Sequence, residues 1–142
     1  MARTNAIDAL NRLFEIEHRS LSTYLADACP WTHAGDEKAS AAIAHILADQ
    51  QQLEARIAEL IDARGGRVES GSFPMEFTEM NMLSFDFLLP ELVRRQKRDI
   101  AAIEQVVASL TNDREARELA EEVLGAERAH LESLEELARQ PA

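Results

Sequence analysis

The chain has 142 residues, of which 46% are hydrophobic and 29% are charged, a composition typical of a globular domain and not of a disordered chain. Fifteen basic residues against 26 acidic residues give a net charge of −11, which argues against nucleic acid or an anionic membrane surface as a partner. One cysteine excludes an internal disulfide, and no apolar run reaches the roughly 20 residues of a membrane span. The first ten residues also lack the apolar core of a signal peptide. We therefore expect a single domain over 1–142 in the cytoplasm.

Apolar residues recur at helical spacing in four blocks, and no alternating strand pattern persists. Pro30 follows the first block, and Asp36 is a plausible cap for the second. The pair Gly65-Gly66 ends the second block, as glycines commonly do after a helix. The pattern predicts an all-α fold with helices over about 4–28, 36–64, 84–110 and 114–139.

The lengths of the connections select a topology for these helices. Short segments join the first helix to the second and the third to the fourth, so each pair is expected to be antiparallel. Between Gly66 and Ser84 the chain has about 18 residues, which extend to about 60 Å, whereas a 25-residue helix is about 37 Å long. This crossover can span the bundle, so the third helix is expected to start at the same end as the second. Phenylalanines in or just after the crossover predict packing on the bundle flank or a dimer interface: Phe73, Phe77, Phe85 and Phe87.

Each predicted helix carries polar residues on or beside its apolar face, near mid-helix. A buried carboxylate costs several kcal/mol unless it is paired, protonated or bound to metal. Several carboxylates together repel one another, so a cation can keep them ionised, and without metal Glu17 or Glu127 is expected to have a raised pKa. The residues are Glu17 in the first helix, Asp49, Gln50 and Gln52 in the second, Gln96 in the third, and Glu127 and His130 in the fourth.

Glu127 and His130 have the i, i+3 spacing that directs two donors at one ion. Carboxylate oxygen and imidazole nitrogen together suit iron, manganese or zinc. This motif also occurs by chance, and its place on the apolar face, opposite Glu17 and Asp49, is what favours a metal site. Gln52 and Gln96 are neutral and poor metal ligands, so a hydrogen-bonded core amide is the other interpretation of these two residues.

The first and last predicted helices resemble those of the ferritin-like superfamily, bacterioferritin and rubrerythrin included. The sequence Leu10-Asn11-Arg12-Leu13-Phe14, followed by Glu17 and Tyr24, is similar to the first helix of the family, and Glu127-Arg-Ala-His130 is similar to its final metal motif. The resemblance implies a ferritin-like four-helix bundle with one long crossover between helices two and three. It also implies a centre in which four glutamates and two histidines hold two irons.

Carried over to this chain, the resemblance makes Glu17 and His130 terminal ligands and Glu127 a bridging ligand. It aligns Asp49 with the second bridge and Gln52 with a family histidine. Gln96 stands where the family has a glutamate. The chain thus supplies one carboxylate and one imidazole fewer than the family, so a standard di-iron oxidase centre is not expected.

The resulting hypothesis is a ferritin-like protein that binds one divalent ion (iron, manganese or zinc) or none. Its expected role is in iron or oxidative-stress handling, and its expected assembly is a homodimer. One alternative is a ferroxidase or oxidase with an unusual ligand set. The other is a non-catalytic four-helix interaction module that has lost metal. The sequence identifies no catalytic residue and leaves enzyme activity undecided.

Overall fold

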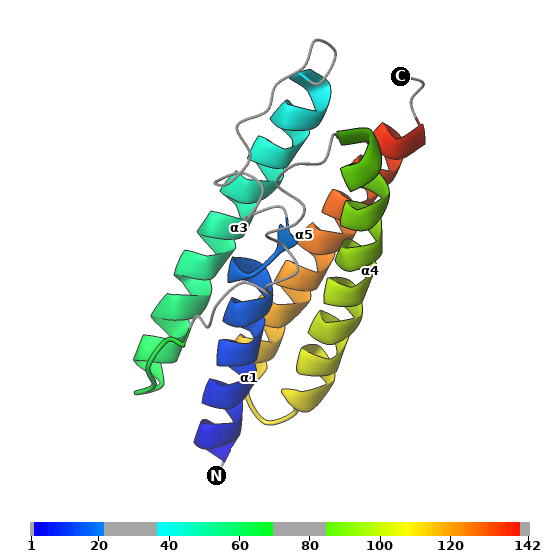
Figure 1. Cartoon of the computed structure of the whole chain (residues 1–142). Coiled ribbons are helices and arrows are strands. Elements are labelled where there is room, and N and C mark those ends of the chain that lie inside the picture. The colour runs from blue at the N-terminus through cyan, green and yellow to red at the C-terminus, as the bar shows by residue number, and fades with distance from the viewer. Residues whose placement is uncertain (1, 22–36, 70–84, 140–142) are drawn as a thin grey trace.

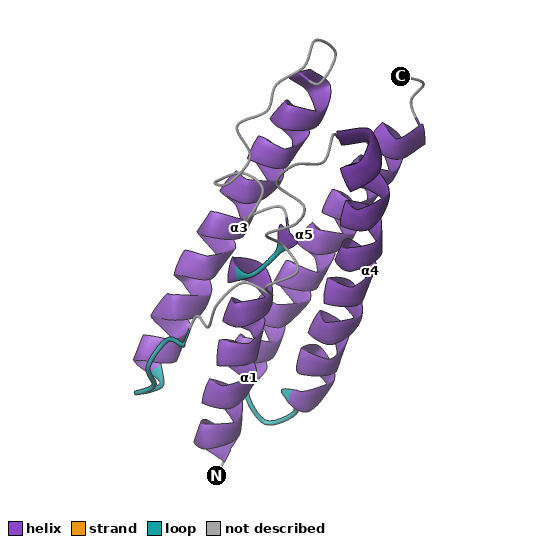
Figure 2. Cartoon of the chain, viewed as in Figure 1, coloured by secondary structure: helices purple, strands orange, loops and turns teal. Residues whose placement is uncertain are grey.

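A computed structural model describes residues 2–21, 37–69 and 85–139. The described residues form four helices and no strand (Figure 2). Helices α1 and α5 run in one direction along the bundle, and α3 and α4 run in the other (Figure 1). The chain is therefore the all-α four-helix bundle that the periodicity predicts. The helices are α1 (Ala2–His18), α3 (Glu37–Ala63), α4 (Phe85–Ser109) and α5 (Arg114–Arg139).

Neighbouring helices in the bundle are antiparallel. The main packed pairs are α1 with α3, α1 with α4, α3 with α5, and α4 with α5. Helix α3 ends at one end of the bundle and α4 begins at the other (Figure 1), which confirms that the connection between them spans its length. Residues 70–84 of that connection lie outside the described residues.

A glycine cap ends α3 where the sequence predicts. The N–H of Gly66 donates to the carbonyl of Ile61 at 2.9 Å, and the N–H of Gly65 donates to the carbonyl of Asp62 at 2.9 Å. This pair of bonds defines a Schellman motif, which places its glycine in the left-handed region. Gly65 has a φ of 80°, and glycine adopts that angle without a steric cost.

Polar side chains fix the chain beyond two helix ends. Asn11 of α1 donates from Nδ2 to the carbonyl of Arg67 at 2.9 Å, and its Oδ1 accepts from the N–H of Glu69 at 2.8 Å. Arg64 donates to both carboxylate oxygens of Asp113, at 2.9 and 3.0 Å. The first residues after α3 are thus held on α1, and the end of α3 is joined to the start of α5.

The first helix is shorter than the predicted block over 4–28. Helix α1 ends at His18, and the hydroxyl of Ser20 donates to Oε1 of Gln50 on α3 at 2.9 Å. The helix is interrupted at Arg19 and Ser20, and Leu21 is helical again. Residues 22–36, which include the rest of the predicted helix, lie outside the described residues.

Phe87 is 74% exposed, so for this residue the expected packing on the bundle flank is wrong. Phe73 and Phe77 lie outside the described residues, as does the side chain of Phe85.

Buried apolar side chains form two clusters, one toward each end of the bundle. The lower core includes Leu10, Leu13, Ile57, Ile61, Ile103 and Val123. The upper core includes Leu21, Ile43, Ile46, Leu88, Leu92 and Leu134. None of the helices described here is both long and apolar enough to cross a membrane.

Candidate functional site

A layer of buried polar side chains separates the two apolar cores. All four helices contribute to this polar layer, and each of its members is at most 4% exposed. Glu127 is positioned by helical periodicity, because it follows the fully buried Val123 by one turn and precedes the fully buried Leu134 by two. The sequence places all five members on or beside an apolar face, and the burial of each is confirmed. The polar layer consists of Glu17, Gln50, Gln96, Glu127 and His130.

Glu127 is the hub of this layer. Gln50 donates from Nε2 to Oε2 of Glu127 at 3.0 Å, and Gln96 donates from Nε2 to Oε1 of Glu127 at 2.9 Å. The same Gln96 nitrogen is 2.9 Å from the main-chain carbonyl of Glu127. Nδ1 of His130 lies 2.5 Å from Oε1 of Glu127. Both carboxylate oxygens of Glu127 therefore accept hydrogen bonds from other helices or from the next turn of α5.

The two buried glutamates differ in protonation. Burial raises the pKa of Glu17 well above its usual range, and the hydrogen bond and negative charge of Glu127 raise it further. Burial also disfavours the Glu127 anion, but hydrogen bonds with Glu17, His130 and Gln96 lower its pKa to about 2. Of the two glutamates, Glu17 is the one that the environment favours in the protonated form, hydrogen-bonded to Glu127. The expected rise in pKa is confirmed at Glu17, whereas Glu127 is shifted in the opposite direction.

His130 lies between two carboxylates. Its Nε2 is 2.8 Å from Oδ2 of Asp49, on the side of the ring opposite Glu127. Burial lowers the pKa of His130, but the hydrogen bonds and charges of Glu127 and Asp49 outweigh it, and the net shift is upward. Asp49, with 39% of its side chain exposed, thus contacts the outer nitrogen of the imidazole. Its expected role as a second bridging ligand stays a prediction.

The structure corrects the assignment on α3 by one residue. The resemblance aligned Asp49 and Gln52 with a family glutamate and histidine, but Gln52 is exposed and lies outside the polar layer. Gln50 occupies the layer instead, followed by a buried Leu53. One residue turns a side chain by about 100° around a helix, so this offset moves a side chain from the core to the surface. Gln96 has the core-amide role that the sequence offered as its alternative.

The polar layer is a hydrogen-bonded network in which the candidate metal ligands contact one another. Within residues 2–21, 37–69 and 85–139, no three histidine, cysteine, aspartate or glutamate side chains are grouped to hold a metal as they stand. The side chains of Glu17, Glu127 and His130 form hydrogen bonds with one another instead. One buried acceptor, Oε1 of Glu17, has no hydrogen-bond partner. Both glutamines turn an N–H toward Glu127, so their Nε2 atoms act there as hydrogen-bond donors.

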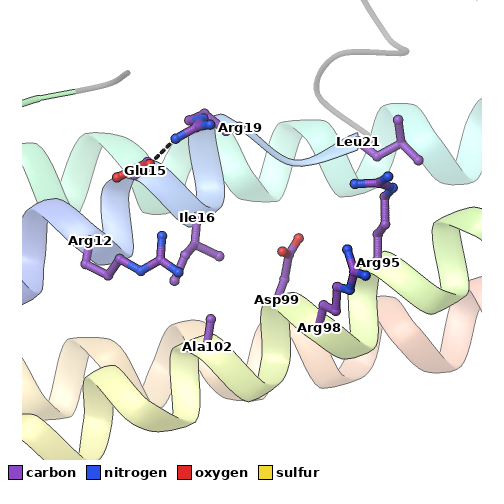
Figure 3. Close-up of a pocket in the computed structure, with 9 residues that line it drawn as sticks. All are labelled: Arg12, Glu15, Ile16, Arg19, Leu21, Arg95, Arg98, Asp99 and Ala102. Carbon is purple, nitrogen blue, oxygen red and sulfur yellow. Dashed lines mark hydrogen bonds and ion pairs between the residues drawn. The ribbon is translucent and has the colours of Figure 1, made fainter. Parts of the chain in front are cut away.

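A second cluster of charge lies beside the layer, between α1 and α4 (Figure 3). Asp99 projects from α4 into this space. Burial and then the charge of Glu127 raise the pKa of Asp99 to about 7, against the opposing charges of Arg95, Arg12 and Arg98. The sequence analysis did not identify this cluster, because its members lie beside the apolar faces of two helices.

Comparison of the chain with protein-family models, curated proteins and solved structures finds no match in any of the three. The ferritin-like resemblance therefore rests on the residues of the first and last helices.

Proposed function

We propose that this chain is a ferritin-like metal-binding protein that binds one divalent cation at Glu17, Glu127 and His130. The observation that carries the proposal is the orphaned Oε1 of Glu17, a buried acceptor with no hydrogen-bond partner beside an ionised carboxylate. A buried polar atom without a partner costs about 1–3 kcal/mol, and a bound cation removes that cost. Iron, manganese and zinc all accept this mixture of oxygen and nitrogen donors.

Exchange of protons for a divalent cation favours a stoichiometry of one ion per chain. The raised pKa values of Glu17 and His130 favour the protonated forms of both side chains. A divalent cation that displaces both protons leaves the net charge of the buried layer unchanged. Metal ligands must be deprotonated to bind, so uptake is expected to release protons.

The remaining polar residues hold the ligands in place. Asp49 accepts from the outer nitrogen of His130, the arrangement by which carboxylates orient histidine ligands. Gln50 and Gln96 fix the carboxylate of Glu127 from two further helices. A bound cation would supply Lewis-acid chemistry or, as iron or manganese, redox chemistry suited to iron or oxidative-stress handling.

Calorimetric titration of chelator-stripped protein with Zn²⁺, Mn²⁺ and anaerobic Fe²⁺ tests the proposal. We expect one ion per chain and release of about two protons, measured by repeating the titration in buffers of different ionisation enthalpy. Glu17→Gln should weaken binding about tenfold or more, since it removes a charged ligand without changing shape. Glu121→Gln is the matched control, because Glu121 is an exposed residue of α5 that pairs with Arg117.

The rival functions give different results in the same assays. Absence of uptake for every ion would contradict the proposal and favour a non-catalytic interaction module, which the hydrogen-bonded state of Glu127 allows. Rapid oxygen consumption on addition of Fe²⁺ would favour the ferroxidase alternative. Uptake of two ions per chain would show that the two glutamines do not limit the site.

The homodimer and the cytoplasmic location are also part of the proposal. A dimer that forms through the exposed Phe87 would remove this apolar side chain from water. Sedimentation velocity of the native chain and of Phe87→Ser tests it, with a shift toward monomer expected in the variant.

A further inference from the structure

A pocket of about 330 Å³ lies between α1 and α4, apart from the proposed metal ligands. Four arginines line it: Arg12 and Arg19 from α1 or just after it, and Arg95 and Arg98 from α4 (Figure 3). Asp99 projects between Arg12 on one side and Arg95 and Arg98 on the other. In a chain with a net charge of −11, this is a local concentration of positive charge.

Two of the four arginines differ from most other arginines of the structure in their ion pairs with carboxylates. Arg19 pairs with Glu15, and Arg95 pairs with Glu91 at 2.7 Å. Arg12 and Arg98 form no ion pair within the described part of the chain, although their charges act on Asp99. Among arginines with described side chains outside the pocket, only Arg67 shares this condition. The others pair with carboxylates: Arg56, Arg64, Arg94, Arg114, Arg117, Arg128 and Arg139.

A buried donor in the same wall also lacks an acceptor. Nε of Arg19 is shielded from solvent and has no hydrogen-bond partner, although its Nη1 pairs with Glu15. Buried donors are satisfied in the great majority of cases, and those that are not call for an explanation. Guanidinium groups bind phosphate and carboxylate oxygens through paired N–H donors, so an oxyanion would supply what Arg12, Arg19 and Arg98 lack.

We propose that this pocket binds a small phosphate monoester through Arg12, Arg19 and Arg98. Arg12 and Arg98, whose guanidinium groups have no ion pair among the described residues, match the two negative charges of a phosphate monoester better than a single carboxylate. The volume is at the lower end of the range for small-molecule sites and leaves room for an organic group beyond the phosphate. Ile16, Leu21 and Ala102 line the same pocket and provide an apolar surface for that group.

Calorimetric titration of the full chain with glycerol 3-phosphate, inorganic phosphate and glycerol tests this site. All titrations contain EDTA, so that a metal ion in the polar layer cannot mediate phosphate binding. We expect glycerol 3-phosphate to bind, inorganic phosphate to bind more weakly, and glycerol not to bind. In the double variant Arg12→Gln/Arg98→Gln the affinity should fall about tenfold or more, since two charge-assisted contacts are removed.

Matched variants connect the result to this pocket. Arg114→Gln/Arg128→Gln removes two exposed arginines of α5 and the same total charge, and should leave affinity unchanged. Asp99→Asn should strengthen binding, because it removes a negative charge from the pocket. Circular dichroism checks that each variant keeps its helices.

No saturable binding at millimolar ligand, or equal losses in the two double variants, would overturn the proposal. Equal affinity for inorganic phosphate would overturn its organic part. Neither result bears on metal uptake.

Discussion

The lower core and the polar layer are adjacent parts of one bundle, yet they are stabilised in different ways. In the lower core, each leucine or isoleucine gains from leaving water, and the gain depends on size and fit more than on direction. In the polar layer, Glu127 accepts from Gln50, Gln96 and His130 at once, so the removal of one group leaves several others without partners. Buried polar networks of this kind are sensitive to every member. The comparison teaches that equal burial does not imply equal tolerance to substitution.

The largest expected effect is that of removing the hub. Glu127→Ala leaves a cavity and deprives Gln50, Gln96 and His130 of their acceptor, so we expect a loss of about 3–5 kcal/mol in unfolding free energy. Urea unfolding in the presence of chelator measures this loss. Glu121→Ala, at the surface of the same helix, should change stability by about 0.5 kcal/mol or less. Similar values for the two variants would mean that the layer is not a linked network.

Truncation in the lower core should cost about 3 kcal/mol. Leu13 is completely buried, and Leu13→Ala removes apolar contacts and leaves a cavity. The comparison is sharpened by restoring volume, because Leu13→Met should cost less than about 1.5 kcal/mol. Glu127→Gln restores volume in the polar layer in the same way, but it should remain costly since it replaces an acceptor with a donor. Recovery of stability in Glu127→Gln would break the distinction between the two regions.

The stability of the fold should fall from pH 5 to pH 7 because of the polar layer and its neighbour Asp99. The raised pKa values of Glu17, His130 and Asp99 favour folding below their unfolded pKa values, and that contribution is lost as pH rises through the folded values. With a folded pKa of about 7, Asp99 alone accounts for about 2 kcal/mol over this range.

Glu127 acts with the opposite sign, because its pKa is lowered to about 2 and its contribution is lost as pH falls below about 4. Stability is therefore expected to be highest near pH 5. Denaturant unfolding at pH 3, 5, 7 and 8 measures the profile, and Asp99→Asn should flatten the decline above pH 5. A native profile that rises from pH 5 to 8 would contradict the assignment of protons to Glu17 and His130.

The smallest effect concerns one amide of the layer. Gln96→Leu removes a donor to the Glu127 carboxylate but adds apolar volume, so we expect a net loss of about 1–2 kcal/mol. Thermal melts with and without chelator measure it. An unchanged melting temperature would show that Gln96 behaves like a residue of the lower core and that the remaining donors satisfy Glu127.

The sequence predicts the fold because helical periodicity is a local property of the chain. Four apolar faces and the connection lengths are enough to indicate a bundle with a crossover. The same periodicity predicts the burial of Glu17, Gln96, Glu127 and His130, since each stands where an apolar residue would otherwise pack. These are the features that a helix determines without knowledge of its neighbours.

The residues that were missed depend on contacts between helices. Gln50 is an exception, because helical periodicity alone places it among the candidate polar residues, whereas the family resemblance selected Asp49 and Gln52. The end of α1 at His18 is followed by a contact between Ser20 and α3 that no pattern within the first helix indicates. The arginine pocket requires α1 and α4 to be placed side by side, which no pattern within one helix reveals.

The direction of α4 has an electrostatic consequence for the whole bundle. Each helix carries a macrodipole, with partial positive charge at its N-terminus and partial negative charge at its C-terminus. Because the crossover makes every main packed pair antiparallel, the dipoles of neighbouring helices oppose one another. Glu17 stands in the last turn of α1, so the partial negative charge at that helix end adds to the contacts that favour its protonated form.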